Sequence, residues 1–147
     1  MAIEIERKFL VDAARLPPLP VADELHQGYL ARDPAVRVRL RTLPGGVRHG
    51  FLTVKGRGLV ARAEFEYEIP PDDAVQLLQL CAIKLRKQRF TLGRWEVDFF
   101  PDSGLWLAEI ELDSEFEAFD RPAWVGAEVS GDARYQNVNL AAAAPGR

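Results

Sequence analysis

Cysteine is nearly absent from this sequence, whose 147 residues include one, Cys81. A single cysteine excludes an internal disulfide and any metal site built from several cysteines. The composition fits a reducing, cytoplasmic compartment, where thiols stay reduced. No apolar run approaches the roughly 20 residues that span a bilayer, and no charged segment followed by an apolar one marks a secretory signal. We therefore expect a cytoplasmic protein that has no membrane partner.

A basic excess is missing as well. Lys and Arg total 19 and Asp and Glu total 22, which gives a formal net charge of −3. General nucleic-acid binding usually requires a basic excess, so we expect no nucleic-acid partner. The hydrophobic share of 48% and the charged share of 28% are ordinary for a globular protein. The length suits one domain with a real core, and we expect that domain to cover residues 1–147.

Alternation of polar and apolar residues dominates the chain, and this period of two predicts strands. Residues 72–82 depart from it, because their apolar positions approach helical spacing after two opening Asp residues. A short turn over 120–124 and a helix over 133–140 complete the tail. The result is an α+β domain rich in antiparallel strands, and eight strands can close into a barrel. The expected strands cover residues 3–11, 26–32, 36–42, 48–56, 62–69, 85–92, 94–100 and 105–113.

Charged residues cluster by sign on one face of individual strands. Arg37, Arg39 and Arg41 alternate with apolar residues along a single strand, and carboxylates stand two residues apart on several others. Like charges side by side on a strand repel, so this arrangement needs a compensating partner. The other charged faces carry Glu4, Glu6 and Lys8; Lys55; Arg62, Glu64 and Glu66; Lys87 and Arg89; Glu96 and Asp98; and Glu109, Glu111 and Asp113.

Two arrangements of these faces fit the pattern. The charged faces could be the solvated outside of a sheet whose apolar faces form the core. Alternatively, a barrel could be turned polar side in, with helices covering part of its apolar outer face. Unpaired charges inside a protein are costly, so such a lumen must be wet, paired or occupied by a ligand. A polyphosphate with Mg²⁺ or Mn²⁺ would suit both kinds of charge, because Arg and Lys bind phosphate and carboxylates bind the metal.

An ordered set of motifs resembles the CYTH, or triphosphate tunnel metalloenzyme, family. Glu4, Glu6 and Lys8 match the N-terminal Glu-x-Glu-x-Lys signature of that family. QGYL, VRVRLR, LTVKG, RAEFEYEIP, KQR, WEVDFF and AEIEL follow in order, so that the resemblance extends from Ile3 to about Leu140. It implies an eight-stranded antiparallel barrel that forms a tunnel and binds triphosphates with Mg²⁺ or Mn²⁺. Among its members, the small bacterial enzymes that hydrolyse inorganic tripolyphosphate to pyrophosphate and phosphate are the most similar.

The resemblance also implies roles for individual residues. Lys8 and Tyr29 match a lysine–tyrosine pair proposed to be catalytic, although Tyr29 could instead be a wall aromatic with a satisfied hydroxyl. Arg41 and Arg62 are further candidates for phosphate binding. The implied metal ligands are Glu4, Glu6, Glu109 and Glu111, with Glu64 and Glu66 holding a second metal or the attacking water. The implied phosphate-binding residues are Lys8, Arg37, Arg39, Lys55, Lys87 and Arg89.

Several functions share this set of charged residues. The alternatives are a class IV adenylyl cyclase, a thiamine or nucleoside triphosphatase, and a polyphosphate-binding module without turnover. A minimal barrel with short loops leaves little room for a nucleoside pocket, which favours inorganic tripolyphosphate as the substrate. No acidic residue of the family pattern is missing, which favours an enzyme. A homodimer is compatible with the sequence.

Overall fold

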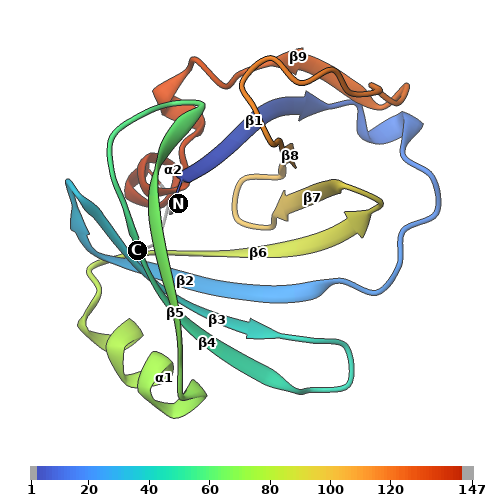
Figure 1. Ribbon diagram of the computed structural model, residues 1–147. Coiled ribbons are helices and arrows are strands. Elements are labelled where there is room, and N and C mark those ends of the chain that lie inside the picture. The colour runs from blue at the N-terminus through green and yellow to red at the C-terminus, as the bar shows by residue number, and fades with distance from the viewer. Residues whose placement is uncertain (1–2, 144–147) are drawn as a thin grey trace.

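Antiparallel strands form a closed ring in the computed structural model, which describes residues 3–143 (Figure 1). Around the ring the order is β5-β4-β3-β2-β6-β7-β8-β1, and the pairing of β1 with β5, at Glu4 and Arg62 for example, closes it. The eight-stranded barrel expected from the sequence is thus confirmed. The ring consists of β1 (Ile3–Val11), β2 (Asp23–Arg32), β3 (Ala35–Thr42), β4 (Arg48–Lys55), β5 (Ala61–Ile69), β6 (Ile83–Leu92), β7 (Trp95–Phe100) and β8 (Leu105–Glu111).

Strand boundaries differ from the predicted ones where a neighbouring strand supplies partners. β2 begins at Asp23 rather than at residue 26, because Asp23 lies opposite Arg89 in the ladder with β6. A ninth strand, β9 (Val125–Glu128), was not predicted and pairs with the second half of β1 beyond the contact with β5. Four residues are too few to show an alternating pattern. Short 3-10 turns lie at Ala13–Arg15 and Ala133–Tyr135.

The charged faces of the strands point into the barrel. On β3, Arg37 and Arg39 are buried among other charged residues, whereas Val38 between them packs on the outer side against α1 (Pro71–Leu80). Proline at the first helical position and acidic residues in the first turn favour the start of α1. Of the two arrangements that the sequence allowed, the barrel turned polar side in is therefore the observed one.

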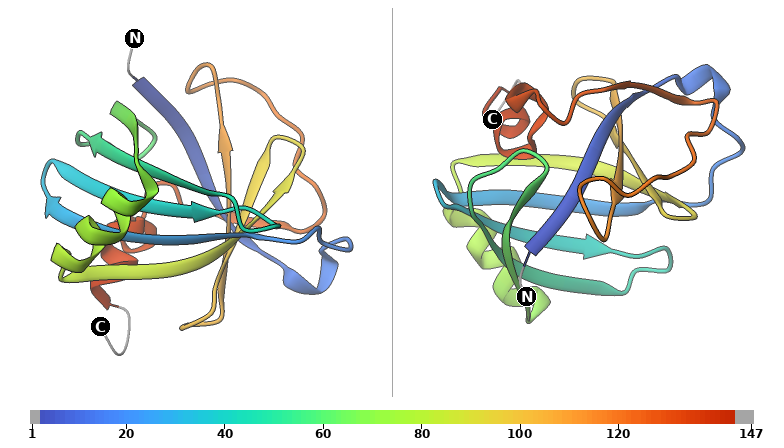
Figure 2. Two further views of the ribbon diagram at one scale, coloured as in Figure 1. Left: turned by 90° about the horizontal axis from the view of Figure 1, so that it is seen from below. Right: turned by 45° about the horizontal axis from the view of Figure 1, so that its top comes forward.

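A helix and the chain segment after β8 cover different parts of the outer face of the barrel (Figure 2). α1 lies outside β2, β3 and β4 and buries Leu78 there. The chain after β8 packs Trp124 against Phe9 and Trp95 on the outer face of β1 and β7. The structure thus confirms a helix on the outside of the barrel, and Cys81, which follows that helix, is buried.

The C-terminal helix α2 (Asn137–Ala143) lies across one end of the barrel. Leu107 and Phe100 continue the inward faces of their strands beyond the charged positions, and they form an apolar cluster with Ala141 and Leu140 of α2. Inward faces are therefore apolar at this end and charged in the middle. No helix within residues 3–143 is both long and apolar enough to cross a membrane.

Phe9 lies in the apolar cluster that Trp95 and Trp124 form on the outer face of the barrel. Its ring is fully buried, meets Trp95 and Phe119 edge to face, and lies under the Arg121 guanidinium. Phe9→Ala should therefore lower the free energy of unfolding by about 3–5 kcal/mol, measured by urea denaturation. Phe116, which is 92% exposed, provides the control, because Phe116→Ala should change it by less than about 0.5 kcal/mol. Equal effects of the two substitutions would contradict this packing.

Candidate functional site

A cavity lies inside the barrel, and cationic side chains dominate its lining. Seven cationic residues and two carboxylates line it within the described part of the chain, together with one aromatic residue, Tyr29. Such an excess of positive charge in a concave site attracts and holds a small, highly charged anion. The cations are Lys8, Arg37, Arg39, Lys55, Arg62, Lys87 and Arg89, and the carboxylates are Glu6 and Glu109.

Three carboxylates approach one another at one side of this cavity. Oxygen atoms of Glu6, Glu96 and Glu109, from β1, β7 and β8, all lie within 4.8 Å of one another. Burial and the adjacent Glu109 raise the pKa of Glu6 well above its usual value. Burial acts in the same direction on Glu109, but Lys8, Lys87 and Arg89 outweigh it and hold the pKa of Glu109 well below the usual value. Glu6 therefore holds a proton more tightly than a free carboxyl group does, and a divalent cation would compete with that proton.

The donor chemistry of this acidic group fits a hard divalent cation. Carboxylate oxygens are the ligands that Mg²⁺ and Mn²⁺ prefer, and Mg²⁺ typically keeps few protein ligands and binds substrate phosphates as well. Glu6 and Glu109 were among the implied metal ligands, and the structure brings them together. Glu96 completes the group, although the sequence suggested no metal role for it.

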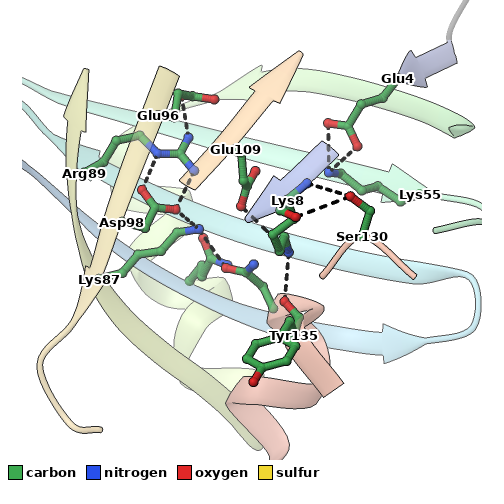
Figure 3. A network of polar contacts seen from close by, with 12 residues as sticks. Glu4, Lys8, Lys55, Lys87, Arg89, Glu96, Asp98, Glu109, Ser130 and Tyr135 are labelled. Atoms are coloured by element: carbon green, nitrogen blue, oxygen red, sulfur yellow. Dashed lines mark hydrogen bonds and ion pairs between the residues drawn. The ribbon is translucent and has the colours of Figure 1, made fainter. Parts of the chain in front are cut away.

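Of the other predicted metal ligands, Glu4, Glu64 and Glu66 contact cations, whereas Glu111 lies opposite Glu6 in the β1–β8 ladder. Glu4 accepts two hydrogen bonds from Lys55 Nζ, at 3.0 and 3.1 Å, and Glu64 lies 3.3 Å from the same ammonium. Glu66 contacts Thr53 Oγ1 at 2.9 Å and Arg37 Nη2 at 3.4 Å. Glu111 is exposed. The first three of these carboxylates therefore compensate the cationic wall. Figure 3 shows the contact of Lys55 with Glu4.

Asp98 of β7 holds two of the predicted phosphate-binding residues (Figure 3). Its fully buried carboxylate lies 2.7 Å from Lys87 Nζ and accepts two hydrogen bonds from Arg89, at 2.8 and 2.9 Å. Burial alone would raise the pKa of Asp98, but Arg89 and Lys87 lower it to about 2. Burial lowers the pKa of Lys87 to about 7 despite the same carboxylate. Asp98 thus fixes the direction of both cations in the cavity wall.

Arg37 and Arg39 project from neighbouring inward positions of β3. Arg37 Nε is buried and has no hydrogen-bond partner among residues 3–143. A buried donor without an acceptor is costly, and a phosphate oxygen is a suitable acceptor for it. Arg39 Nε donates to Gln27 Oε1 at 2.8 Å. Arg62 and Arg41 were the two further candidates for phosphate binding. Arg62 lines the cavity, whereas Arg41 pairs with Asp23 and does not line it.

The predicted lysine–tyrosine pair lines the same cavity from β1 and β2. Lys8 Nζ donates to the backbone oxygen of Tyr135 at 2.8 Å and lies 3.8 Å from Glu109. Tyr29 is buried, and its hydroxyl accepts from Gln27 Nε2 at 3.3 Å. Lys8 and Tyr29 therefore each have a separate hydrogen-bond partner in the protein, and both side chains line the same cavity.

Four residues near the site were not assigned a role from the sequence. Glu96 and Asp98 alternate with apolar residues as the other charged faces do. This alternation would have indicated that both residues point into the barrel. Gln27 is an uncharged residue on an inward face, and Asn137 belongs to the C-terminal helix, so neither belongs to a charged alternation. Asn137 Oδ1 accepts from Lys87 Nζ at 2.7 Å, which brings the C-terminal helix into contact with the cationic wall.

Comparison with known proteins agrees with this geometry. The CYTH domain family model matches residues 2–143. The inorganic triphosphatase of Acetivibrio thermocellus is 42% identical over 95% of this chain and 94% of its own length. That of Nitrosomonas europaea is 37% identical over 97% of this chain and 99% of its own. The crystal structure of the inorganic triphosphatase NE1496 superposes with a TM-score of 0.62 at 34% identity, covering 99% of both chains. This chain therefore belongs to the CYTH domain family.

Proposed function

We propose that this protein is a metal-dependent hydrolase that cleaves inorganic tripolyphosphate to pyrophosphate and phosphate inside the barrel. The observation that carries the proposal is the lining of the cavity, to which seven cations contribute within the described part of the chain. The two curated relatives bear the name inorganic triphosphatase, which supports the same reaction class. A chain of three phosphates has the charge and the slender shape that such a lining accommodates.

The cationic wall would bind and align the phosphates. Arg37 offers a buried Nε–H that has no acceptor within residues 3–143, and Lys87 and Arg89 are held in place by Asp98. Fixed donors of this kind cost little reorganisation when charge moves between phosphate oxygens in the transition state. The proposed phosphate-binding residues are Lys8, Arg37, Arg39, Lys55, Lys87 and Arg89.

Glu6, Glu96 and Glu109 would hold Mg²⁺ or Mn²⁺, while Glu4, Glu64, Glu66 and Glu111 remain candidates for a second metal. A bound divalent cation supplies charge neutralisation at the phosphates and lowers the pKa of water. Glu109, which is ionised in the free protein, keeps one anionic ligand available at neutral pH. Glu6 would release its proton on metal binding, so the affinity for the metal should increase with pH.

Lys8 and Tyr29 are the proposed catalytic pair. Water attacks the terminal phosphorus, a new P–O bond forms, and the bond to the bridging oxygen breaks with pyrophosphate as the leaving group. The water loses a proton, and both Lys8 and Tyr29 line the space where that proton must be accepted or passed on. Lys8 is kept near the substrate by the Tyr135 backbone oxygen.

The preferred substrate is the first prediction of the proposed function. Only Tyr29 among the described residues offers an aromatic ring to the cavity, so a nucleobase or thiazole has no stacking partner there. Phosphate release should therefore be faster from tripolyphosphate than from ATP or thiamine triphosphate, should require Mg²⁺ or Mn²⁺, and should cease with EDTA. Much faster turnover of ATP, or cyclic AMP formation at a comparable rate, would contradict the proposal.

The composition of the acidic group is the second prediction. Glu6→Gln should fold normally and lower kcat/KM at least about 100-fold, since even outer-shell metal partners are worth 10- to 100-fold. Glu96→Gln should raise the Mg²⁺ concentration for half-maximal activity about tenfold. Glu115→Gln, on an exposed loop, is the control with the same loss of charge. A larger effect of Glu111→Gln than of Glu96→Gln would place the metal nearer the end of β8.

The catalytic pair gives the third prediction. Tyr29→Phe keeps the ring and removes the hydroxyl, so kcat should fall by about 100-fold while the melting temperature changes little. Lys8→Gln should lower kcat and also raise KM, because Lys8 is proposed to contact phosphate too. Steady-state phosphate release at several substrate concentrations separates the two parameters. If Tyr29→Phe retains full kcat, Tyr29 is only a wall residue of the tunnel.

A further inference from the structure

Arg39 differs from the other proposed phosphate-binding residues in the partner that holds it. Within residues 3–143, Arg39 makes no ion pair with a carboxylate, and its Nε donates instead to the neutral amide of Gln27 at 2.8 Å. The other five each contact a carboxylate: Lys8 with Glu109, Arg37 with Glu66, Lys55 with Glu4, and Lys87 and Arg89 with Asp98.

Gln27 is itself held at both ends. It is fully buried and lies directly opposite Arg39 in the ladder between β2 and β3. Its Oε1 accepts from Arg39, while its Nε2 donates to the Tyr29 hydroxyl at 3.3 Å and to Asn137 Oδ1 at 3.2 Å. These contacts leave the amide one orientation, in which its oxygen faces the guanidinium.

A neutral partner orients a cation without cancelling its charge. Burial, together with the nearby Arg37 and Arg89, lowers the pKa of Arg39 to about 9, so the guanidinium is still charged at neutral pH. Keeping a buried charge without a counterion is unfavourable for the free protein. A bound anion relieves this unfavourable energy, which makes the anion bind more tightly at Arg39 than at a cation that a carboxylate already compensates.

We propose that Gln27 is a positioning residue that holds Arg39 oriented but uncompensated, and that it thereby sets the affinity of the tunnel for triphosphate. The inference rests on the proposed function, since it assumes a triphosphate in the cavity. It implies a trade-off at one position: a carboxylate there would compensate Arg39 in the free protein and weaken anion binding.

Gln27→Glu tests this, because glutamate has the same size as glutamine and adds the missing counterion. Its second oxygen can accept from the Tyr29 hydroxyl but cannot donate to Asn137 Oδ1 as the amide does. Binding of tripolyphosphate would be measured by calorimetry in EDTA, where no metal supports turnover, and the melting temperature in the same buffer without ligand. We expect the Kd to rise at least about tenfold, equivalent to about 1.4 kcal/mol. The melting temperature of the ligand-free protein should exceed that of Gln27→Met, because the new ion pair with Arg39 offsets the lost donation to Asn137.

Two further variants separate the charge effect from the loss of contacts. Gln27→Met keeps the length but removes every hydrogen bond, so it should lower the melting temperature and raise the Kd only about threefold, because Arg39 remains charged. Gln76→Glu makes the same charge change on the exposed side of α1 and should alter neither quantity.

The outcomes are distinct. Tripolyphosphate binding to Gln27→Glu as tight as to the wild type would overturn this inference alone. So would a melting temperature for Gln27→Glu as low as that of Gln27→Met, because Gln27 would then be required only for folding. No binding of tripolyphosphate by the wild-type protein would overturn the proposed function and this inference with it. Weaker tripolyphosphate binding by a Gln27→Glu protein that melts above Gln27→Met would support the inference.

Discussion

The burial of many charges inside a closed sheet is the constraint on which the rest of this structure depends. Charged side chains cannot lie inside a protein without partners or a ligand, because desolvation outweighs any single attraction. The barrel satisfies most of them by pairing across strands, as Asp98 does for Lys87 and Arg89 and as Glu4 does for Lys55. The outer face is consequently apolar, and it needs the cover that α1 and the segment after β8 provide.

Pairing in the barrel is incomplete in a way that suits a ligand. Within residues 3–143, Arg37 Nε is a buried donor without a partner, and Arg39 is held by an amide rather than by a carboxylate. Glu6, Glu96 and Glu109 form an acidic group in which Glu96 contacts Arg89 and Glu109 contacts Lys8. In the described part of the chain, Arg39 at the proposed phosphate positions and Glu6 at the proposed metal position are thus ionisable groups without an ion pair. An anion with its divalent cation would neutralise both.

The C-terminal segment links the fold to the site. Tyr135 and Asn137 lie far along the chain from the β1 and β6 lysines, yet each provides an oxygen to one of them, at 2.8 Å to Lys8 and at 2.7 Å to Lys87. The helix that begins at Asn137, α2, also closes one end of the barrel with apolar side chains. The cavity is therefore bounded by a part of the chain that does not belong to the barrel.

The sequence by itself determined the strands, their charged faces and the family, because alternation and motif order are local properties that can be read along the chain. It did not determine which carboxylates meet. Glu6, Glu96 and Glu109 come together through the pairing of β1 with β8 and of β8 with β7, whereas Glu4 is drawn to Lys55 across the β1–β5 closure. The roles of Gln27 and Asn137 were likewise decided only in the tertiary structure. Neither residue is charged or part of a repeating pattern, and their importance arises from what lies beside them in the closed barrel.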